Sequence, residues 1–385
     1  MTQADWRTYR KGFLSFATLA VVYFVFHSYP GNNGNGGTVQ PVHFENTKSY
    51  TDRLSANDRP VSMKNDSEQP DVQHVIIFTI RRSGSTFLSE IFNQNDDYMF
   101  FFEPLASYEM MKKKTSDPSL IPDIRSYSKQ LLPAIYHCNF TQVPTWTHLP
   151  DLCFHLGGYD RIRSLSSYCK SKQFQNDDVN SDGKKYLSST CRKYKGIAIK
   201  TIRVSDIQNL YDLVLDPKLN VKVIYLVRDP RGIINSRYKA VRQFEEVKAK
   251  RKDPLLRGGP EPIRPNEVSE ICTHMERNLQ YWIDTPEWLK GRYKLVRYED
   301  MAGNPISVTR DIYNFIQMPL PVSVTHWLDV NTKQTAGRGK LTNTVTTRNS
   351  NVTAYKWQTE LQRSVIDDVQ LKCKKTLDIL GYELV

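Results

Sequence analysis

Two stretches, Val75–Phe87 (VIIFTIRRSGSTF) and Val223–Arg237 (VIYLVRDPRGIINSR), decide the fold of this 385-residue chain. Each has an apolar run of strand length, then a loop of Arg, Ser and Gly, then a helical pattern. A strand that enters a helix through such a loop turns the helix N-terminus and backbone N–H groups toward an anion. Two loops of this kind predict a ligand with phosphates at both ends of a nucleoside.

Apolar runs typical of strands buried in a parallel sheet recur along the chain. They lie at Val75–Ile80, Ile197–Ile199, Val221–Val227 and Tyr293–Val296. Apolar residues at helical spacing separate them, at Ser85–Gln94, Asn304–Ile316 and Thr359–Leu380. This alternation predicts an α/β fold, a three-layer sandwich around a parallel sheet. The irregular stretch from about residue 117 to 195, which holds four cysteines, predicts an insertion pinned by disulfides.

The N-terminal region predicts a membrane anchor. Residues 13–29 carry no charge, three basic residues stand in 1–12, and the next acidic residue is Glu45. This pattern predicts a cytoplasmic tail over 1–12, a transmembrane signal-anchor over 13–29 and a luminal body. A cleaved signal peptide is the alternative, although no small-x-small cleavage site follows. Residues 30–72 are polar and rich in Asn and Gly, which predicts a flexible stem before one folded domain at 73–385.

The cysteines agree with an oxidising compartment, since all six follow the predicted anchor. Four of them cluster, which leaves Cys272 and Cys373 as the natural long-range pair. Pairing among Cys138, Cys153, Cys169 and Cys191 stays open. No Cys or His spacing indicates a metal site. N-glycosylation patterns, which also suit a lumen, begin at Asn65, Asn139 and Asn351.

The charge balance favours anionic partners. The net charge is +12, but the chain holds no helix-turn-helix, zinc-finger or RNP pattern. Nucleic acid is therefore disfavoured as a partner, and an anionic nucleotide together with an acidic glycan is expected. The sequence leaves a homodimer open.

The first loop has the chemistry of a phosphate cradle. Gly84 permits a tight turn and a close backbone approach, and Arg82 offers a charge-assisted contact. Hydroxyl groups and the following helix N-terminus supply further donors. No Lys precedes the Ser and Thr, so the loop differs from a Walker A loop and argues against a kinase.

The second loop strengthens the prediction. Arg228 ends a strand, and Ser236 falls about two turns into the following helix. An Arg and a Ser so placed can hold one phosphate from two sides.

Together the two loops resemble the 5′- and 3′-phosphate-binding elements of sulfotransferases that use 3′-phosphoadenylyl sulfate. Residues 73–385 are similar to the Golgi galactose/N-acetylgalactosamine/N-acetylglucosamine 6-O-sulfotransferases, nearest to the keratan sulfate galactose 6-sulfotransferases. Besides the loops, the matching stretches include Phe102–Leu105, Ile197–Arg203, Leu295–Asp300 and Thr347–Ser350. The resemblance implies a fold like that of P-loop kinases and a single-pass type II Golgi membrane enzyme. Its implied reaction moves a sulfuryl group to a sugar 6-hydroxyl of a keratan- or chondroitin-type glycan, without a metal.

The resemblance also implies roles for residues. Arg82 would stabilise the leaving phosphate, and Arg228 and Ser236 would hold the 3′-phosphate. The 5′-phosphate would be cradled by Ser83, Gly84, Ser85, Thr86 and Phe87. Apart from the resemblance, Lys200 and Arg203 follow a strand end and are candidates for contacts to donor or acceptor, with packing or ion pairing as the alternative. Arg348 and Ser350 are candidates for contacts to the nucleotide from a closing loop.

Glu103 is the candidate catalytic base, because it follows the apolar run Tyr98–Phe102 and aromatic neighbours would raise its pKa. The alternatives are a loop cap or a pair with Arg81, and the rival bases are His74 and His155. The neighbours Glu299 and Asp300 are expected on a strand, pointing to opposite faces, with a structural role.

Three alternative functions are considered beside this one. A tyrosylprotein or heparan-type sulfotransferase would share the fold. A catalytically silent glycan-binding protein would need no pair of phosphate loops, and a luminal kinase would need the missing Lys. The sequence leaves open whether galactose, N-acetylglucosamine or N-acetylgalactosamine is the acceptor.

Overall fold

The computed structural model describes residues 73–114, 122–143, 163–165, 181–251, 263–332 and 350–385. The predicted tail, anchor and stem lie outside these residues. So do Asn65, Cys153, His155, Cys169 and Arg348. Within the described residues, no helix is both long enough and apolar enough to cross a membrane.

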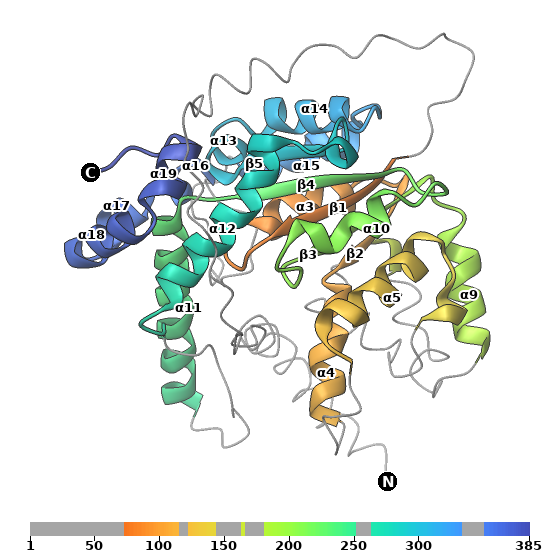
Figure 1. Ribbon diagram of the computed structural model, residues 1–385, viewed down its shortest axis with the longest axis horizontal. Helices are drawn as coiled ribbons and strands as arrows, with labels where there is room; N and C mark the ends of the chain where they lie inside the picture. Colours follow the sequence, from red (N-terminus) through yellow and green to blue (C-terminus); the bar gives the residue numbers. More distant parts are fainter. Residues whose placement is uncertain (1–72, 115–121, 144–162, 166–180, 252–262, 333–349) are drawn as a thin grey trace.

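Across the described residues, five parallel strands form one sheet in the order β2-β3-β1-β4-β5 (Figure 1). They are β1 (His74–Thr79), β2 (Tyr98–Phe102), β3 (Gly196–Thr201), β4 (Val221–Val227) and β5 (Tyr293–Arg297). The four strands expected from apolar runs are confirmed, and β2 coincides with the apolar run before Glu103. All residues of β2 and β3 are buried, as expected of strands covered on both faces.

Helices cover both faces of the sheet, which confirms the three-layer sandwich (Figure 1). One layer holds α3 (Ser85–Asn93), α14 (Pro305–Phe315) and α15 (Val322–Thr332). The other holds α5 (Ile124–Tyr136), α10 (Tyr211–Val214) and α12 (Glu267–Asp284). The 22-residue helix α11 (Pro230–Arg251) follows β4 and packs against the C-terminal helices.

The C-terminal region differs from the single helix expected over Thr359–Leu380. That prediction is wrong, because the chain forms α17 (Trp357–Glu360), α18 (Arg363–Lys372) and α19 (Lys374–Leu380). Leu361 and Gln362 are extended, and Cys373 leaves helical geometry between α18 and α19. Gly381 ends α19 with φ 68°, the expected left-handed cap.

The remaining described elements connect these layers. The helices are α4 (Ser107–Lys114), α9 (Ser181–Cys191), α13 (Tyr298–Gly303) and α16 (Ser350–Tyr355). The short 3₁₀ turns are η1 (Pro104–Ala106), η3 (Phe140–Gln142), η4 (Arg163–Leu165), η5 (Ile207–Leu210) and η6 (Glu287–Leu289).

Two disulfides join the described cysteines. Cys272 of α12 bonds to Cys373, which confirms the long-range pair, and their Cα atoms lie 5.2 Å apart. Cys138 bonds to Cys191 at the end of α9, with a Cα–Cα distance of 5.5 Å. The second bond pins α9 near the end of α5 and fixes the described part of the insertion.

Candidate active site

The five strands deliver the candidate residues to one place. Because the strands are parallel, their carboxyl ends meet at the same edge of the sheet. The first loop leaves β1 and the second loop leaves β4, which is its neighbour. Glu103 follows β2, Lys200 lies near the end of β3, and Tyr298 follows β5.

Backbone strain marks both residues predicted to be catalytic. Arg82 has φ 76° and Glu103 has φ 55°, and they are two of five non-glycine residues with positive φ in the described part of the chain. Such conformations cost of order 1–3 kcal/mol and gather at functional sites. The strain supports both residues as parts of an active site.

The first loop offers buried donors to an anion. Gly84, with φ 90°, is the N-cap of α3, and its carbonyl accepts the N–H groups of Phe87 and Leu88. Ser83 is fully buried, and its hydroxyl has no hydrogen-bond partner among the described residues. A buried hydroxyl without a partner costs free energy, so this one is suited to a ligand.

The two loops are joined directly. Nη1 of Arg228 donates to the carbonyl oxygen of Arg82 at 3.0 Å. Nε of Arg82 donates to the hydroxyl of Ser236 at 2.9 Å. The residues expected at opposite phosphates therefore belong to one continuous cluster. Nε of Arg228, which is buried, has no hydrogen-bond partner in the described structure.

Tyr298, which the sequence analysis did not single out, fills the space between the loops. The Arg228 guanidinium carbon lies 4.4 Å from the centroid of the Tyr298 ring. A Cβ atom on Gly84 would overlap the same ring, and one on Gly232 would lie 2.9 Å from Nε of Arg228. Gly84, Tyr298, Arg228 and Gly232 thus form a close stack that spans both loops. The sequence signal that could have pointed to Tyr298 is an aromatic residue directly after a predicted strand.

Glu103 is held by two cations. Its Oε1 pairs with the ammonium of Lys200, and its Oε2 accepts from Nη1 of Arg203 at 2.6 Å and from the Ile202 N–H at 3.2 Å. All three charged side chains are at most 5% exposed. The aromatic strand expected before Glu103 is present as β2, but the two cations that hold its carboxylate were not expected there. The Lys200 ammonium lies 4.3 Å from the Phe102 ring centroid.

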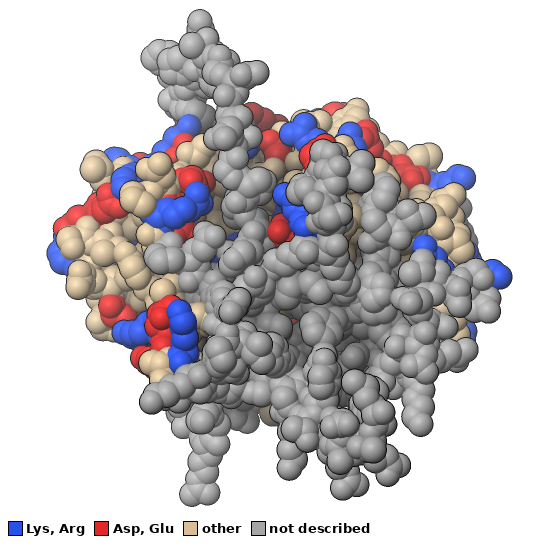
Figure 2. Space-filling view, turned by 90° about the horizontal axis from the view of Figure 1, so that it is seen from below, with Lys and Arg blue, Asp and Glu red and all other residues tan. Residues whose placement is uncertain are grey.

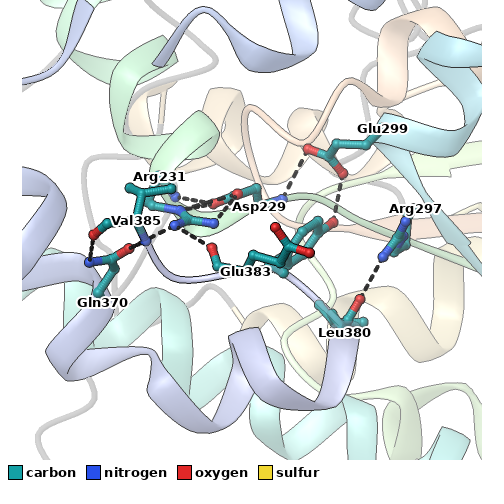
Figure 3. Close-up of polar contacts among 9 residues, drawn as sticks. Asp229, Arg231, Arg297, Glu299, Gln370, Leu380, Glu383 and Val385 are labelled. Atoms are coloured by element: carbon teal, nitrogen blue, oxygen red, sulfur yellow. Dashed lines mark hydrogen bonds and ion pairs between the residues drawn. The ribbon is translucent and has the colours of Figure 1, made fainter. Parts of the chain in front are cut away.

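A second buried carboxylate stands beneath the second loop. Glu299 accepts the backbone N–H of Asp229 at 3.2 Å and the hydroxyl of Tyr382 at 2.6 Å (Figure 3). Burial raises the pKa of Glu299 to about 7, while attraction to Arg228 opposes this shift and repulsion from Asp229 adds to it. Glu299 and Asp300 were expected on a strand, but they lie in the first turn of α13.

The neighbouring Arg81 also belongs to a buried ionic group. Its Nη2 lies 3.8 Å from Oε1 of Glu267, which pairs with Arg237 as well. Nη2 of Arg237 in turn donates to the Arg81 carbonyl oxygen at 3.4 Å. Glu267 therefore links α11 and α12 to the start of the first loop.

Several predicted residues lie away from the cluster. The Ser350 hydroxyl is buried and donates to the Ala302 carbonyl at 2.8 Å. The Phe87 ring points into the core, 6.3 Å from the Trp327 ring. His74 begins β1 at the opposite edge of the sheet, which removes it as a rival base. Of the described sequons, Asn351 is exposed and Asn139 is partly buried.

The distribution of charged side chains on the described surface does not mark a second site. On the described part of the face in Figure 2, basic and acidic side chains are intermixed. Within the described residues, no group of His, Cys, Asp and Glu could hold a metal ion. The buried arginines and hydroxyls of the two loops are the candidate anion-binding groups.

Comparison with known proteins identifies the family. The model of the sulfotransferase domain matches residues 72–381. Carbohydrate sulfotransferase 1 of Mus musculus is 33% identical over 335 residues, which cover 81% of this chain and 79% of that protein. Carbohydrate sulfotransferase 3 of Mus musculus is 29% identical over 337 residues, covering 81% and 68%.

Among solved structures, the sulfotransferase domain from the curacin biosynthetic pathway aligns at 16% identity with a TM-score of 0.43. The alignment covers 83% of this chain and all of that one. The assignment itself rests on the family model and on the sequence relatives. The chain belongs to the sulfotransferase domain family and, within it, to the carbohydrate sulfotransferases.

Proposed function

We propose that the chain transfers a sulfuryl group from 3′-phosphoadenylyl sulfate to the 6-hydroxyl of a sugar in a glycan. The observation that carries this proposal is the joining of the two loops through Arg82, Arg228 and Ser236. A site built from two joined phosphate loops fits a nucleotide with a phosphate at each end better than it fits ATP. The unpartnered Ser83 hydroxyl and Arg228 Nε, both buried, are suitable donors to those phosphates.

In the proposed reaction, the sugar hydroxyl oxygen attacks sulfur in line with the bond to the 5′-phosphate. The bond from the sugar oxygen to sulfur forms as the bond from sulfur to the 5′-phosphate oxygen breaks. The electron pair of the broken bond leaves with the 5′-phosphate. Ser83, Ser85, Thr86 and the N-terminus of α3 would cradle this phosphate. Arg82 would stabilise its growing charge, so that positioning and charge stabilisation supply most of the acceleration.

We assign Glu103 as the base that accepts the proton of the sugar hydroxyl. Oε2 of Glu103 already accepts two hydrogen bonds, whereas Oε1 is paired with Lys200 alone among the contacts described above. A carboxylate oxygen can accept two hydrogen bonds, which leaves Oε1 room for the hydroxyl. Lys200 and Arg203 would then hold the carboxylate in place beside the reacting hydroxyl.

We further propose that the protein is a single-pass type II membrane protein of the Golgi with its catalytic domain in the lumen. The uncharged run at 13–29 and the basic residues before it support this placement. The two disulfides in the described domain fit an oxidising lumen. The acceptor would be a keratan- or chondroitin-type chain or a related N- or O-glycan.

The test is sulfate transfer by the full-length chain from radiolabelled donor to desulfated keratan, desulfated chondroitin and glycans ending in N-acetylglucosamine. Linkage analysis of the product is expected to place the label on C6 of one sugar. Label on another position would remove the 6-hydroxyl assignment. Transfer to a peptide tyrosine, with none to any glycan, would contradict the proposed acceptor class.

A further inference from the structure

The turn that carries Arg228 is anchored by residues from two later segments of the chain (Figure 3). Glu299, in the first turn of α13, accepts the backbone N–H of Asp229 at 3.2 Å. The other oxygen of Glu299 accepts the hydroxyl of Tyr382, which follows α19, at 2.6 Å. Both Glu299 and Asp229 are 3% exposed.

Arg231 fixes the same turn from its other side. Its guanidinium pairs with both carboxylate oxygens of Asp229, with Nη2 at 2.8 Å from Oδ2. Its Nη1 donates to Oε1 of Gln370 at 2.8 Å and to the carbonyl of Glu383 at 2.9 Å. The guanidinium also lies 4.1 Å from the centroid of the Trp357 ring. Asp229 is therefore held by its N–H through Glu299 and by its carboxylate through Arg231.

These anchors set the place of Arg228, which directly precedes Asp229 and is 7% exposed. The Tyr298 ring packs against one side of the Arg228 guanidinium. Gly232 lies so close on the other side that an added Cβ atom would stand 2.9 Å from Nε of Arg228. A shift of the turn would therefore push the Arg228 side chain against the Tyr298 ring or against Gly232. Glu299 uses its two oxygens on Asp229 and Tyr382, so it acts on the ligand through the turn.

We propose that Glu299 and Tyr382 are positioning residues. Through the turn at Asp229 they hold the Arg228 guanidinium where it can bind the 3′-phosphate of the donor. This inference rests on the proposed function. It assigns to the segment after α19 a part in donor selection, although that segment lies in no phosphate loop.

The test compares two nucleotides on the same preparation of full-length protein. The dissociation constant of adenosine 5′-monophosphate divided by that of adenosine 3′,5′-bisphosphate defines the 3′-phosphate preference. Because both constants are measured on one sample, a partly unfolded fraction cancels. Tyr382→Phe is expected to lower the preference by about threefold to tenfold, as for the loss of one hydrogen bond of ordinary strength.

Glu299 variants separate position from charge. Glu299→Ala is expected to lower the preference at least as much as Tyr382→Phe. Glu299→Gln is expected to keep it within about threefold of the original, because the amide oxygen can still accept the Asp229 N–H. In the Glu299→Ala background, Tyr382→Phe should have no further effect, since Tyr382 acts through Glu299.

A matched control is Tyr313→Phe. Tyr313 is 1% exposed, and its hydroxyl donates to the Ile91 carbonyl at 2.8 Å, near the end of α3 remote from the first loop. This variant should leave the 3′-phosphate preference unchanged. An unchanged preference in Tyr382→Phe and Glu299→Ala, or equal losses in Tyr382→Phe and Tyr313→Phe, would overturn the positioning role. If the unaltered protein itself shows no preference, the 3′-phosphate assignment fails, and with it the proposed donor.

Discussion

Arg228 and Tyr298 come from the ends of neighbouring strands, and the guanidinium of the first lies 4.4 Å from the ring centroid of the second. The same ring fills the space left by the missing side chain of Gly84 in the first loop. One aromatic side chain therefore touches both phosphate loops. This contact explains how two loops separated in sequence keep a fixed spacing.

Replacing Tyr298 by Leu should weaken the grip on the 3′-phosphate. The cation–π contact of a buried pair is worth about 1–2 kcal/mol, so the 3′-phosphate preference should fall by roughly tenfold. Tyr298→Phe keeps the ring and should stay within about threefold. Nucleotide binding by calorimetry gives both values. Equal losses in the two variants would show that the hydroxyl, and not the ring face, matters.

Gly84→Ala should disturb the first loop in two ways, through its φ of 90° and through overlap with the Tyr298 ring. We expect weaker nucleotide binding together with a lower melting temperature. Gly291→Ala is the matched control, because Gly291 also has a positive φ, 67°, but has no atom within 4 Å of an added Cβ. The control should lose about 1–2 kcal/mol of stability, the cost of a left-handed backbone for an L-residue, and bind nucleotide normally. Normal binding by Gly84→Ala would contradict the close stack.

Glu103→Gln should keep nucleotide binding and slow sulfate transfer by roughly 10²- to 10⁴-fold, as for a lost general base. The glutamine has nearly the same size, and its one amide oxygen can accept from either Lys200 or Arg203. Single-turnover transfer with bound donor measures the chemical step, and nucleotide binding serves as the control. Near-normal turnover would remove Glu103 from the mechanism.

Acid should destabilise the fold through His74. Burial lowers the pKa of His74 to about 4, with repulsion from His137 adding to the shift, and its Nδ1 accepts the Ile197 N–H at 3.1 Å. Between pH 6.5 and 4 the unfolded chain then binds more protons at this residue than the folded chain. Stability from His74 is therefore lost as the pH falls through that window, by at most about 2 kcal/mol from pH 6.5 to 5.

The His74 prediction is tested by the free energy of unfolding at pH 7 and pH 5. His74→Gln does not titrate, so it should lose less stability on acidification than the original protein. His274 shifts in the same direction and Glu299 in the opposite one, but both are present in each variant. Identical pH dependence in the two proteins would contradict the assignment.

Much of the fold was predictable because buried parallel strands leave apolar runs in the sequence. The loops after β1 and β4 were found for the same reason, since each follows such a run. The long helix Thr359–Leu380 was mispredicted because helical spacing continues across Cys373. The disulfide from Cys373 to Cys272 was expected, but nothing in the local sequence shows that the helix is interrupted at Cys373.

The site was harder to predict than the fold, because its decisive contacts are long-range. The partners of Glu103 lie 97 and 100 residues away, on and just after β3. A sequence window around Glu103 shows aromatic neighbours and no cation. Tyr298 was missed because an aromatic residue after a strand is usually part of the core. Its role appears only when β5 lies beside β4.

The most direct test of the account is the 3′-phosphate preference of the unaltered protein and of Arg228→Ala. If the joined loops read both phosphates of one nucleotide, the unaltered protein should bind the 3′,5′-bisphosphate far more tightly than the 5′-monophosphate. Loss of a charge-assisted contact should lower that preference in Arg228→Ala by roughly 10- to 100-fold, with 5′-monophosphate binding little changed. An unchanged preference in Arg228→Ala would contradict the central claim.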